Sequence, residues 1–588
     1  GGVGVRSRAR PGLLGMAMQD GRTESDVDEA SKAGPQDSLK KELAERSWLV
    51  SPEDEKKADI GISQFVGSPF DRGVGGAPPP LKKEDVGTVV ADFTNSKMSL
   101  PRLLWSRGAD AIEDLIDPIG KPMVRSREDK ARSGRKKLVV LGSGWGAHAL
   151  LKTLDANKYD VQIVSPRNYF VFTPMLAGAA TGTVELRSIT ESIRSANVGA
   201  DYLEATAMEI DPERKTISCE AVVCDGGQCS ISEFSVPYDM LVVGVGASVN
   251  TFGIKGVRDH CFFLKQISDA AALRAAIGNT FERANLPGMS DEERVKTLTF
   301  VVVGAGPTGI EFTAELRDFI EQDLPKFYPD LLQFVRIRVL EASDRVLMQF
   351  RESMQAKAVD NIERSAPAVP GLLPDYTKVL LQSAVNEVTQ DTITLNDGTV
   401  LPYGIAVWAA GIGPLPVTLD LIKKIPECAE NEMARGRLVT DRWMRVAGTG
   451  GAVLAIGDCA FVKDSPLPAT AQVAAQQGSY LGRLLSRGYD FAEAVPTKTD
   501  GEASKSARAG MARPFQFLNL GILAYTGGNS ALAQVQLDDV KVTDQAGAVG
   551  WLAWRSVYLA KQVSWKNQVS VLFDWAKTSL FGRDITRF

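Results

Sequence analysis

Two glycine fingerprints, each placed between an apolar strand-like run and a helix-like run, constrain this chain more than any other feature. The first, Gly142-Ser143-Gly144-Trp145-Gly146-Ala147, follows the run 137–141, and the second, Gly304-Ala305-Gly306-Pro307-Thr308-Gly309, follows the run 298–303. In such a unit the first glycine permits a tight turn and the second lets the backbone approach a pyrophosphate. The third small residue packs the helix on the strand. Because this order occurs twice, the sequence predicts an α/β fold with two Rossmann-like dinucleotide-binding domains.

The residue that ends the second strand of each unit suggests which nucleotide is held. The strand at 161–164 ends in Ser165, where an acid is expected to hold the adenosine ribose. The strand at 335–340 ends in Glu341, which would accept hydrogen bonds from a ribose 2′-hydroxyl and repel a 2′-phosphate. This favours NADH over NADPH, the alternative being an exposed acid at a strand end. An aromatic-rich loop at 168–175 can line a flavin ring. One flavin and one diffusible nicotinamide are therefore expected.

Three later strands are expected to return the chain to these nucleotides. The strand at 238–243 runs into Gly246-Ala247, and the strand at 406–409 runs into Ala410-Gly411. The strand at 452–456 leads into Gly457-Asp458, where the carboxylate would accept hydrogen bonds from the ribityl hydroxyls of a flavin. A Gly-Asp pair alone is weak evidence for a flavin site, but after two glycine fingerprints in this order it is strong evidence.

Composition narrows the chemistry further. The 588 residues allow about three or four domains, and a net charge of −5 gives no sign of nucleic-acid binding. Six cysteines include no C-x-x-C pair, and the histidines are only His148 and His260. A zinc site, another metal site or a Ser-His-Asp triad is therefore not expected. The chemistry must come from a cofactor.

The N-terminal part differs from the rest of the chain. Residues 1–19 contain Arg6, Arg8 and Arg10 and no acid before Asp20, which resembles the end of an organelle transit peptide. The alternative is a basic end with no targeting role. Residues 100–116 form an amphipathic helical pattern without an evident task.

Motifs spread along the chain point to one family. They are Gly142–Ala147, Ser165–Phe170 with Phe172-Thr173-Pro174, Gly304–Glu311, Gly457-Asp458, Ala471–Gln477 and Leu580–Phe588. With them, the chain from about Lys137 to Phe588 resembles the type II (alternative) NADH:quinone oxidoreductases. These are single-polypeptide FAD enzymes of mitochondrial, plastid and bacterial membranes. Family members similarly carry serine after the second strand of the FAD unit.

The resemblance implies non-covalent FAD at Gly142, Gly144, Thr173 and Asp458, and NADH at Gly304, Gly306, Gly309 and Glu341. The full set of expected cofactor-binding residues is Gly142, Ser143, Gly144, Trp145, Gly146, Ala147, Ser165, Pro166, Arg167, Thr173, Pro174, Gly246, Ala247, Gly304, Gly306, Pro307, Thr308, Gly309, Glu341, Ala410, Gly411, Gly457, Asp458, Ala471 and Gln472.

The resemblance also implies a quinone site beside the flavin, with Glu311, Gln472 and Gln476 as the expected catalytic residues. Glu311 matches the acid of the second glycine motif, where nicotinamide and flavin meet. The alternatives are that Glu311 is an ordinary helix residue, and that the two glutamines, one helical turn apart, cap the helix or face solvent.

The C-terminal end is expected to meet a membrane surface. Four of the nine tryptophans, Trp551, Trp554, Trp565 and Trp575, lie there among Arg555, Lys561, Lys566 and Lys577. This pattern predicts two amphipathic helices, broken near Ser564, that lie on a bilayer. The alternative is packing against the protein's own body or a dimer partner. The uncharged stretch 514–537 holds too many polar residues to span a membrane and is expected to form a strand, a Gly-Gly turn and a helix.

The expected domains follow from these assignments. They are an N-terminal extension over 1–135, a first FAD-binding part over 136–265, an NADH-binding domain over 266–436, a second FAD-binding part with the quinone-site segment over 437–545, and membrane-associating helices over 546–588.

The expected function is a NADH:ubiquinone oxidoreductase that pumps no protons, since no iron–sulfur ligand set is visible. We expect a homodimer on the mitochondrial inner membrane, or on a plastid membrane as the alternative. Two other functions remain open. One is a sulfide:quinone or disulfide-type reductase, which would need a cysteine pair at the flavin. The other is an apoptosis-inducing-factor-like binding or redox-sensing flavoprotein.

Overall fold

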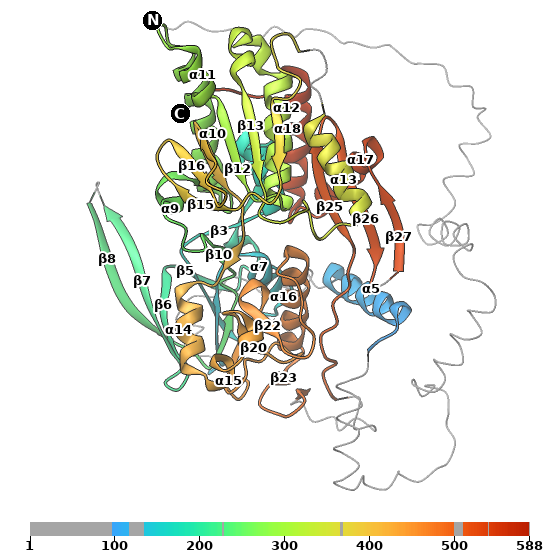
Figure 1. Cartoon of the computed structure of the whole chain (residues 1–588). Coiled ribbons are helices and arrows are strands. Elements are labelled where there is room, and N and C mark those ends of the chain that lie inside the picture. Colours follow the sequence, from blue (N-terminus) through green and yellow to red (C-terminus); the bar gives the residue numbers. More distant parts are fainter. Residues whose placement is uncertain are drawn as a thin grey trace, which may run out of the picture. The chain divides into compact units, whose positions relative to one another are not determined.

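Two five-stranded parallel sheets carry the two glycine fingerprints (Figure 1). The computed structural model describes residues 97–116, 134–225, 228–364, 369–498, 510–538 and 540–586. The expected targeting segment at 1–19 therefore lies outside the described residues.

The first sheet forms around β1, the strand before the first fingerprint. Its strands, in spatial order, are β21 (Val453–Ala455), β9 (Met240–Val243), β1 (Lys137–Leu141), β2 (Asp160–Ser165) and β5 (Asp201–Glu204). Every pair is parallel, and the apolar side chains of β1 are buried on both faces, as parallel sheets require. Helices α7 (Trp145–Thr153) and α16 (Ala471–Ser486) pack on each other beside this sheet. The strands expected at 161–164, 238–243 and 452–456 are thus confirmed.

The second sheet repeats the plan around β12. Its spatial order is β11 (Phe262–Phe263), β18 (Ile405–Trp408), β12 (Thr299–Val303), β13 (Arg336–Leu340) and β14 (Thr377–Leu380). All its pairs are parallel. Helices α10 (Ile267–Ala284), α12 (Pro307–Gln322) and α13 (Glu352–Glu363) share its core. The long connection from Gly304 to Glu341 holds α12 and two short 3₁₀ helices.

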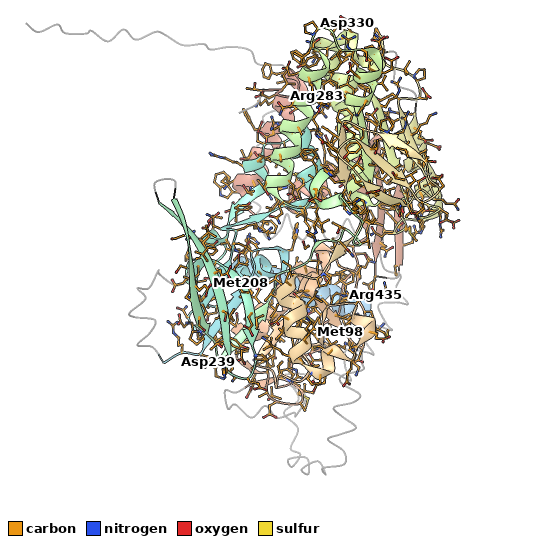
Figure 2. The ribbon with its side chains drawn as sticks, turned by 60° about the vertical axis from the view of Figure 1, so that its left-hand side comes forward. Met98, Met208, Asp239, Arg283, Asp330 and Arg435 are labelled. Atoms are coloured by element: carbon orange, nitrogen blue, oxygen red, sulfur yellow. The ribbon has the colours of Figure 1, made fainter. Side chains whose placement is uncertain are left out.

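Two antiparallel three-stranded sheets flank these units. One contains β6 (Thr206–Asp211), β7 (Thr216–Asp225) and β8 (Gln228–Pro237), and β7 and β8 pair as a long hairpin. The other contains β15 (Val385–Val388), β16 (Thr392–Leu395) and β17 (Val400–Pro402). Helix α14 (Pro416–Lys424) packs on β6. Figure 2 shows Met208 of β6 and Asp239 before β9 on one sheet unit, and Arg283 of α10 on the other.

The C-terminal part corrects one expectation. Residues 522–545 form an antiparallel sheet of β25 (Ile522–Gly527), β26 (Ser530–Leu537) and β27 (Val540–Gln545). The segment after the Gly-Gly turn is therefore a strand, and the helix expected there is wrong. The Ala- and Leu-rich start of that segment favours a helix locally, but pairing with strands on both sides overrides propensity.

Two helices end the described chain, and a third precedes the first sheet. Helices α17 (Ala548–Ala560) and α18 (Trp565–Phe581) are separated at Ser564, which caps α18, so the expected break is confirmed. Helix α5 (Leu100–Ile116) has the bounds that the sequence pattern predicts. Among the residues that the structure describes, no helix is both long and apolar enough to cross a bilayer.

Candidate functional site

The first fingerprint forms a turn that only glycine permits at its first position. Gly142 has φ +103°, and a Cβ there would lie 2.4 Å from the carbonyl oxygen of Gly244 at the end of β9. By contrast, a Cβ on Gly144 would meet nothing within 4 Å. Gly144 is the N-cap of α7, and no side chain caps that helix end. The open loop and the free helix N–H groups therefore suit a pyrophosphate.

Side chains around this loop hold it in place. The buried hydroxyl of Ser165 donates to Ser143 Oγ at 3.1 Å and accepts from the Arg167 N–H at 3.3 Å. The indole N–H of Trp145 donates to Thr173 Oγ1 at 3.0 Å, and its ring packs on Phe170 edge-to-face. Ser165 thus braces the glycine loop, and Trp145 joins that loop to the aromatic segment expected beside a flavin.

Asp458 stands at the carboxyl end of the same sheet, just after β21. Its neighbour Gly457 donates its N–H to Gln477 Oε1 of α16 at 2.7 Å. Burial raises the pKa of Asp458, while the nearby charges of Lys265 and Arg437 lower it. Burial in turn lowers the pKa of Lys265. An open helix N-terminus, whose N–H groups can donate to a phosphate, and a carboxylate that can accept from hydroxyls together fit an FAD.

The second fingerprint has the same geometry. Gly304 has φ +101°, and a Cβ there would lie 2.9 Å from the backbone of Ala410 after β18. Gly306 caps α12 with open space beside it, and a Cβ on Gly309 would lie 1.9 Å from the Gly304 carbonyl oxygen. This loop can therefore hold a second pyrophosphate.

Glu341 lies beside that loop. Its Oε2 accepts from the Ala305 N–H at 2.8 Å, and its Oε1 accepts from the N–H and the hydroxyl of Ser343, each at 2.9 Å. The side chain is half-buried. The carboxylate is therefore held in one position at the strand end, next to the fingerprint where a ribose is expected.

Glu311 is buried where three parts of the chain meet. It lies one turn into α12, and its Oε1 accepts from the Tyr525 N–H of β25 at 3.2 Å and from the Trp554 indole of α17 at 3.3 Å. Burial raises the pKa of Glu311 to about 8, although both hydrogen bonds lower it. A small cavity, called the inner cavity here, is lined by Pro174, Gly178, Thr183, Glu311, Glu315 and Tyr525 among others. The flavin-side loop, the nicotinamide-side helix and the C-terminal part thus meet at Glu311.

The two expected quinone-site glutamines hold a backbone segment. Gln472 accepts from the Leu520 N–H at 3.0 Å and donates to the Gly521 carbonyl at 3.4 Å. Gln476 accepts from the Leu518 N–H at 3.0 Å and donates to the Leu518 carbonyl at 2.8 Å. Both amides therefore fix the segment 518–521, which leads into β25, on the face of α16.

Helix α5 is bonded to Gln476 and to the residues just before the segment 518–521. Arg107 donates to the Gln516 carbonyl at 2.9 Å and to Gln476 Oε1 at 3.5 Å. Asp110 forms ion pairs with Arg483 of α16 and with Arg487 just after it. Leu103, on the buried face of α5, is only 1% exposed.

The remaining expected residues lie around the two loops. Gly146 and Ala147 are buried in α7, whereas Pro166 is exposed after β2. Gly246 and Ala247 follow β9, and Ala471 opens α16. Pro307 and Thr308 open α12, and Pro174 lines the inner cavity. Gly411 follows Ala410 beyond β18 and is exposed.

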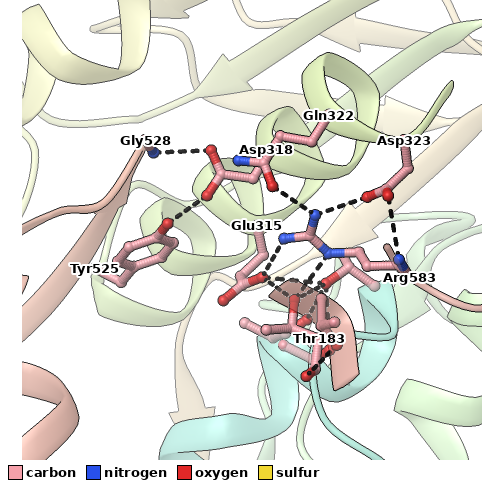
Figure 3. Close-up of polar contacts among 12 residues, drawn as sticks. Thr183, Glu315, Asp318, Gln322, Asp323, Tyr525, Gly528 and Arg583 are labelled. Atoms are coloured by element: carbon pink, nitrogen blue, oxygen red, sulfur yellow. Dashed lines mark hydrogen bonds and ion pairs between the residues drawn. The ribbon is translucent and has the colours of Figure 1, made fainter. Parts of the chain in front are cut away.

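Sequence reasoning missed the charged groups that surround these residues. Lys265 and Arg437 come to Asp458 from distant segments. Figure 3 shows Glu315, Asp318 and Asp323 on α12 and the turn after it, with Arg583 and Thr183 among them. The motifs do not include Glu315, Asp318 or Asp323, and Arg583, which lies in the closing motif Leu580–Phe588, meets these carboxylates only through the fold. The one available signal was the spacing of Glu311, Glu315 and Asp318, which places them on one helix face.

Comparisons with known proteins match this arrangement. The model for pyridine nucleotide-disulphide oxidoreductases matches residues 136–478, and the model for the NDH2 C-terminal domain matches residues 519–584. The chain is 36% identical to a probable NADH dehydrogenase of Dictyostelium discoideum, over 82% of this chain and 98% of that protein.

A second relative and a solved structure are also similar to this chain. The chain is 34% identical to external alternative NAD(P)H-ubiquinone oxidoreductase B1, mitochondrial, of Solanum tuberosum, over 80% of this chain and 93% of that one. The solved structure of NDH2 from Plasmodium falciparum in complex with NADH is 26% identical. It matches with a TM-score of 0.66 over 77% of this chain and all of that one.

Proposed function

Because this chain belongs to the type II NADH dehydrogenases within the pyridine nucleotide-disulphide oxidoreductase family, we propose that it is a mitochondrial NADH:ubiquinone oxidoreductase with non-covalent FAD. The observation that carries the proposal is the meeting of both fingerprint units and the C-terminal part at buried Glu311. The reaction moves a hydride equivalent from NADH to a quinone and pumps no protons.

FAD would be held by the first fingerprint and by Asp458. When bound, it supplies the redox chemistry, which is hydride acceptance from NADH and two-electron donation to a quinone. The N-terminus of α7 would favour the pyrophosphate charge, and Asp458 would accept from the ribityl hydroxyls. The Trp145–Thr173 hydrogen bond would hold the aromatic segment beside the ring.

NADH would lie on the second fingerprint, with its pyrophosphate at the N-terminus of α12. Glu341, held by Ala305 and Ser343, would accept from the ribose hydroxyls and repel a 2′-phosphate. This arrangement supports NADH as the preferred donor.

Glu311 would hold the proton that the quinone needs. Because burial raises its pKa to about 8, the carboxyl is protonated at neutral pH and can donate. Gln472 and Gln476 would act by positioning the segment 518–521 as a wall of the quinone site, since their amides are bonded to it.

The C-terminal helices would rest on the membrane that carries the quinone. Exposed apolar residues of α17 and α18 support this, among them Val549, Leu552, Trp565, Leu572, Phe573 and Phe581. The opposite side, with Trp554 only 7% exposed, packs on the protein's own body. A homodimer is also proposed.

The test is NADH oxidation by the purified protein with a short-chain ubiquinone, with NADPH in parallel and the released cofactor identified. We expect rapid NADH-dependent quinone reduction, released FAD and weaker turnover with NADPH. Bound FAD with negligible quinone reduction would favour a binding or sensing flavoprotein instead. Quinone reduction driven by sulfide would favour the sulfide:quinone reductase alternative.

A further inference from the structure

The proposed reaction needs a proton that NADH does not supply. Converting a quinone to a quinol forms two O–H bonds and takes up two electrons and two protons. The hydride from NADH carries both electrons and one proton, so the second proton comes from solvent. Since Glu311 is buried, a path must connect its carboxyl to water. The need for such a path rests on the proposed function.

Glu311 and Glu315 both line the inner cavity. It has room for about one water molecule, and the polar residues in its mostly apolar lining, Glu311, Glu315 and Thr183 among them, can bond one. The two glutamates are four residues apart on α12 and so share a helix face. A single water can therefore link them.

Glu315 presents its two oxygens to different surroundings. Oε1 lies next to Gly178 at the wall of the inner cavity, where a Cβ would approach it to 3.4 Å. Oε2 accepts from Thr183 Oγ1 at 2.5 Å and from Thr181 Oγ1 at 3.4 Å. Figure 3 shows this carboxylate between Thr183 and the guanidinium of Arg583.

Thr181 connects this side to a second, larger cavity. This outer cavity, about 1100 Å³ including its mouth, is lined by Thr181, Arg274, Phe281 and Tyr328 and by the exposed residues Glu282 and Asp584. The Thr181 hydroxyl lies within hydrogen-bonding reach of Glu315 Oε2, of Thr183 Oγ1 and of the Gly178 carbonyl. A hydroxyl that can rotate among such acceptors can take a proton on one side and release one on the other.

We propose that Thr181 and Glu315 form a proton inlet that carries protons from the outer cavity, across the water of the inner cavity, to Glu311. A solvent proton reaches the Thr181 oxygen as that hydroxyl releases its own proton to Glu315. Glu315 passes a proton through the water to Glu311, and Glu311 delivers one to a quinone oxygen. Each relay group ends as it began, and one O–H bond forms on the quinone.

The charged groups around Glu315 fit a relay. Arg583 pairs with Glu315 at 3.4 Å and with Asp323 at 2.9 Å, and it also bonds Thr183. Asp318 lies one turn on, bonded to the Tyr525 hydroxyl and the Gly528 N–H. Arg555 and Tyr558 of α17 also face this region. One arginine shared between two carboxylates lets Glu315 change protonation without leaving an unpaired buried cation.

The test compares Glu315→Gln with Glu321→Gln. Glu321 lies on the same helix, is also buried and pairs with Arg317 at 2.6 Å, but it lines neither of the two cavities. We expect Glu315→Gln to lower quinone turnover about a hundredfold, the weaker end of general acid–base effects. Ferricyanide takes up no proton on reduction, so NADH:ferricyanide rates should stay unchanged. If Glu315→Gln does not fold, Thr181→Val, which replaces only the hydroxyl, serves instead. It should likewise lower quinone turnover and leave NADH:ferricyanide turnover unchanged.

A second readout does not depend on turnover. The infrared carbonyl band of protonated Glu311, assigned with Glu311→Gln, shifts when the protein is moved into D₂O. Thr181→Val and Glu315→Gln should slow that exchange about a hundredfold, as for the loss of a proton-transfer group, and Glu321→Gln should not. The inlet would be overturned if Glu311 exchanged at the wild-type rate in both Thr181→Val and Glu315→Gln. It would also be overturned if Glu321→Gln slowed the exchange as much as they do. A wild-type protein without quinone reduction would overturn the proposed function, whereas the exchange rates would still decide whether the inlet exists.

Discussion

Glu311 shows how far burial changes one residue's chemistry. The carboxyl accepts from Tyr525 and Trp554, both of which favour its charged form. Desolvation is nevertheless the largest effect, and it raises the pKa from 4.5 to about 8. A residue that the second glycine motif marks only by position thereby becomes an acid at neutral pH.

This raised pKa predicts a pH dependence of stability. Between pH 4.5 and about pH 8, native Glu311 keeps a proton that the unfolded chain has lost. The free energy of unfolding should therefore fall as pH rises through this window and level off above it. Glu311→Gln should remove that part of the decline, measured by thermal melts between about pH 5 and about pH 9. Parallel curves for the two proteins would contradict the assignment.

Glu341 predicts the choice of nucleotide. Glu341→Gln keeps an oxygen that can accept from Ser343 but removes the charge that would repel a 2′-phosphate. The preference for NADH over NADPH should fall about tenfold, which corresponds to about 1.4 kcal/mol of lost repulsion. The measurement is kcat/KM for both nucleotides. An equal loss with NADH and NADPH would instead indicate that the fingerprint loop had moved.

At the scale of elements, α5 is bonded to helix α16 and to the residues that precede the segment 518–521. Arg107 reaches both Gln516 and Gln476, and Asp110 pairs with Arg483 and Arg487. The amphipathic pattern predicted the helix, but its task depends on contacts with residues nearly four hundred positions away.

We predict that Arg107→Ala loosens the segment 518–521. Losing about 1 kcal/mol of charge-assisted bonding should raise KM for the quinone about fivefold, with NADH:ferricyanide turnover unchanged. Arg102→Ala, which changes an exposed arginine of the same helix, is the matched control. An unchanged KM for the quinone in Arg107→Ala would show that α5 does not position this segment.

At the scale of the whole molecule, the exposed apolar residues concentrate on the C-terminal helices. Trp565, Phe573 and Phe581 are 77%, 68% and 81% exposed. Water-exposed aromatic side chains of this size are costly unless another apolar phase covers them.

We therefore predict that Trp565→Glu combined with Phe573→Glu weakens binding to phospholipid vesicles more than tenfold, since two large side chains would no longer be buried. Sedimentation with vesicles measures this. The control is Leu286→Glu, which changes a 56% exposed apolar residue just after α10. Equal binding by the double variant and the wild type would place the membrane contact elsewhere.

The sequence alone determined the two dinucleotide-binding units and most of their strands. The reason is local, because a β-strand, a glycine turn and a helix start are encoded within about fifteen consecutive residues. The same holds for Glu341, which follows its strand directly, and for the helix break at Ser564. The strand at Ser530–Leu537 escaped sequence reasoning, because its pairing with β25 and β27 outweighs a composition that favours a helix.

Only the tertiary structure decided what surrounds the reacting centre. Burial raises the pKa of Glu311, against two hydrogen bonds that lower it, and the bonding residues Tyr525 and Trp554 are more than two hundred positions away. Arg583 reaches Glu315 and Asp323 from the last described residues of the chain. A buried charge depends on every group packed around it, and local sequence patterns do not specify those distant neighbours.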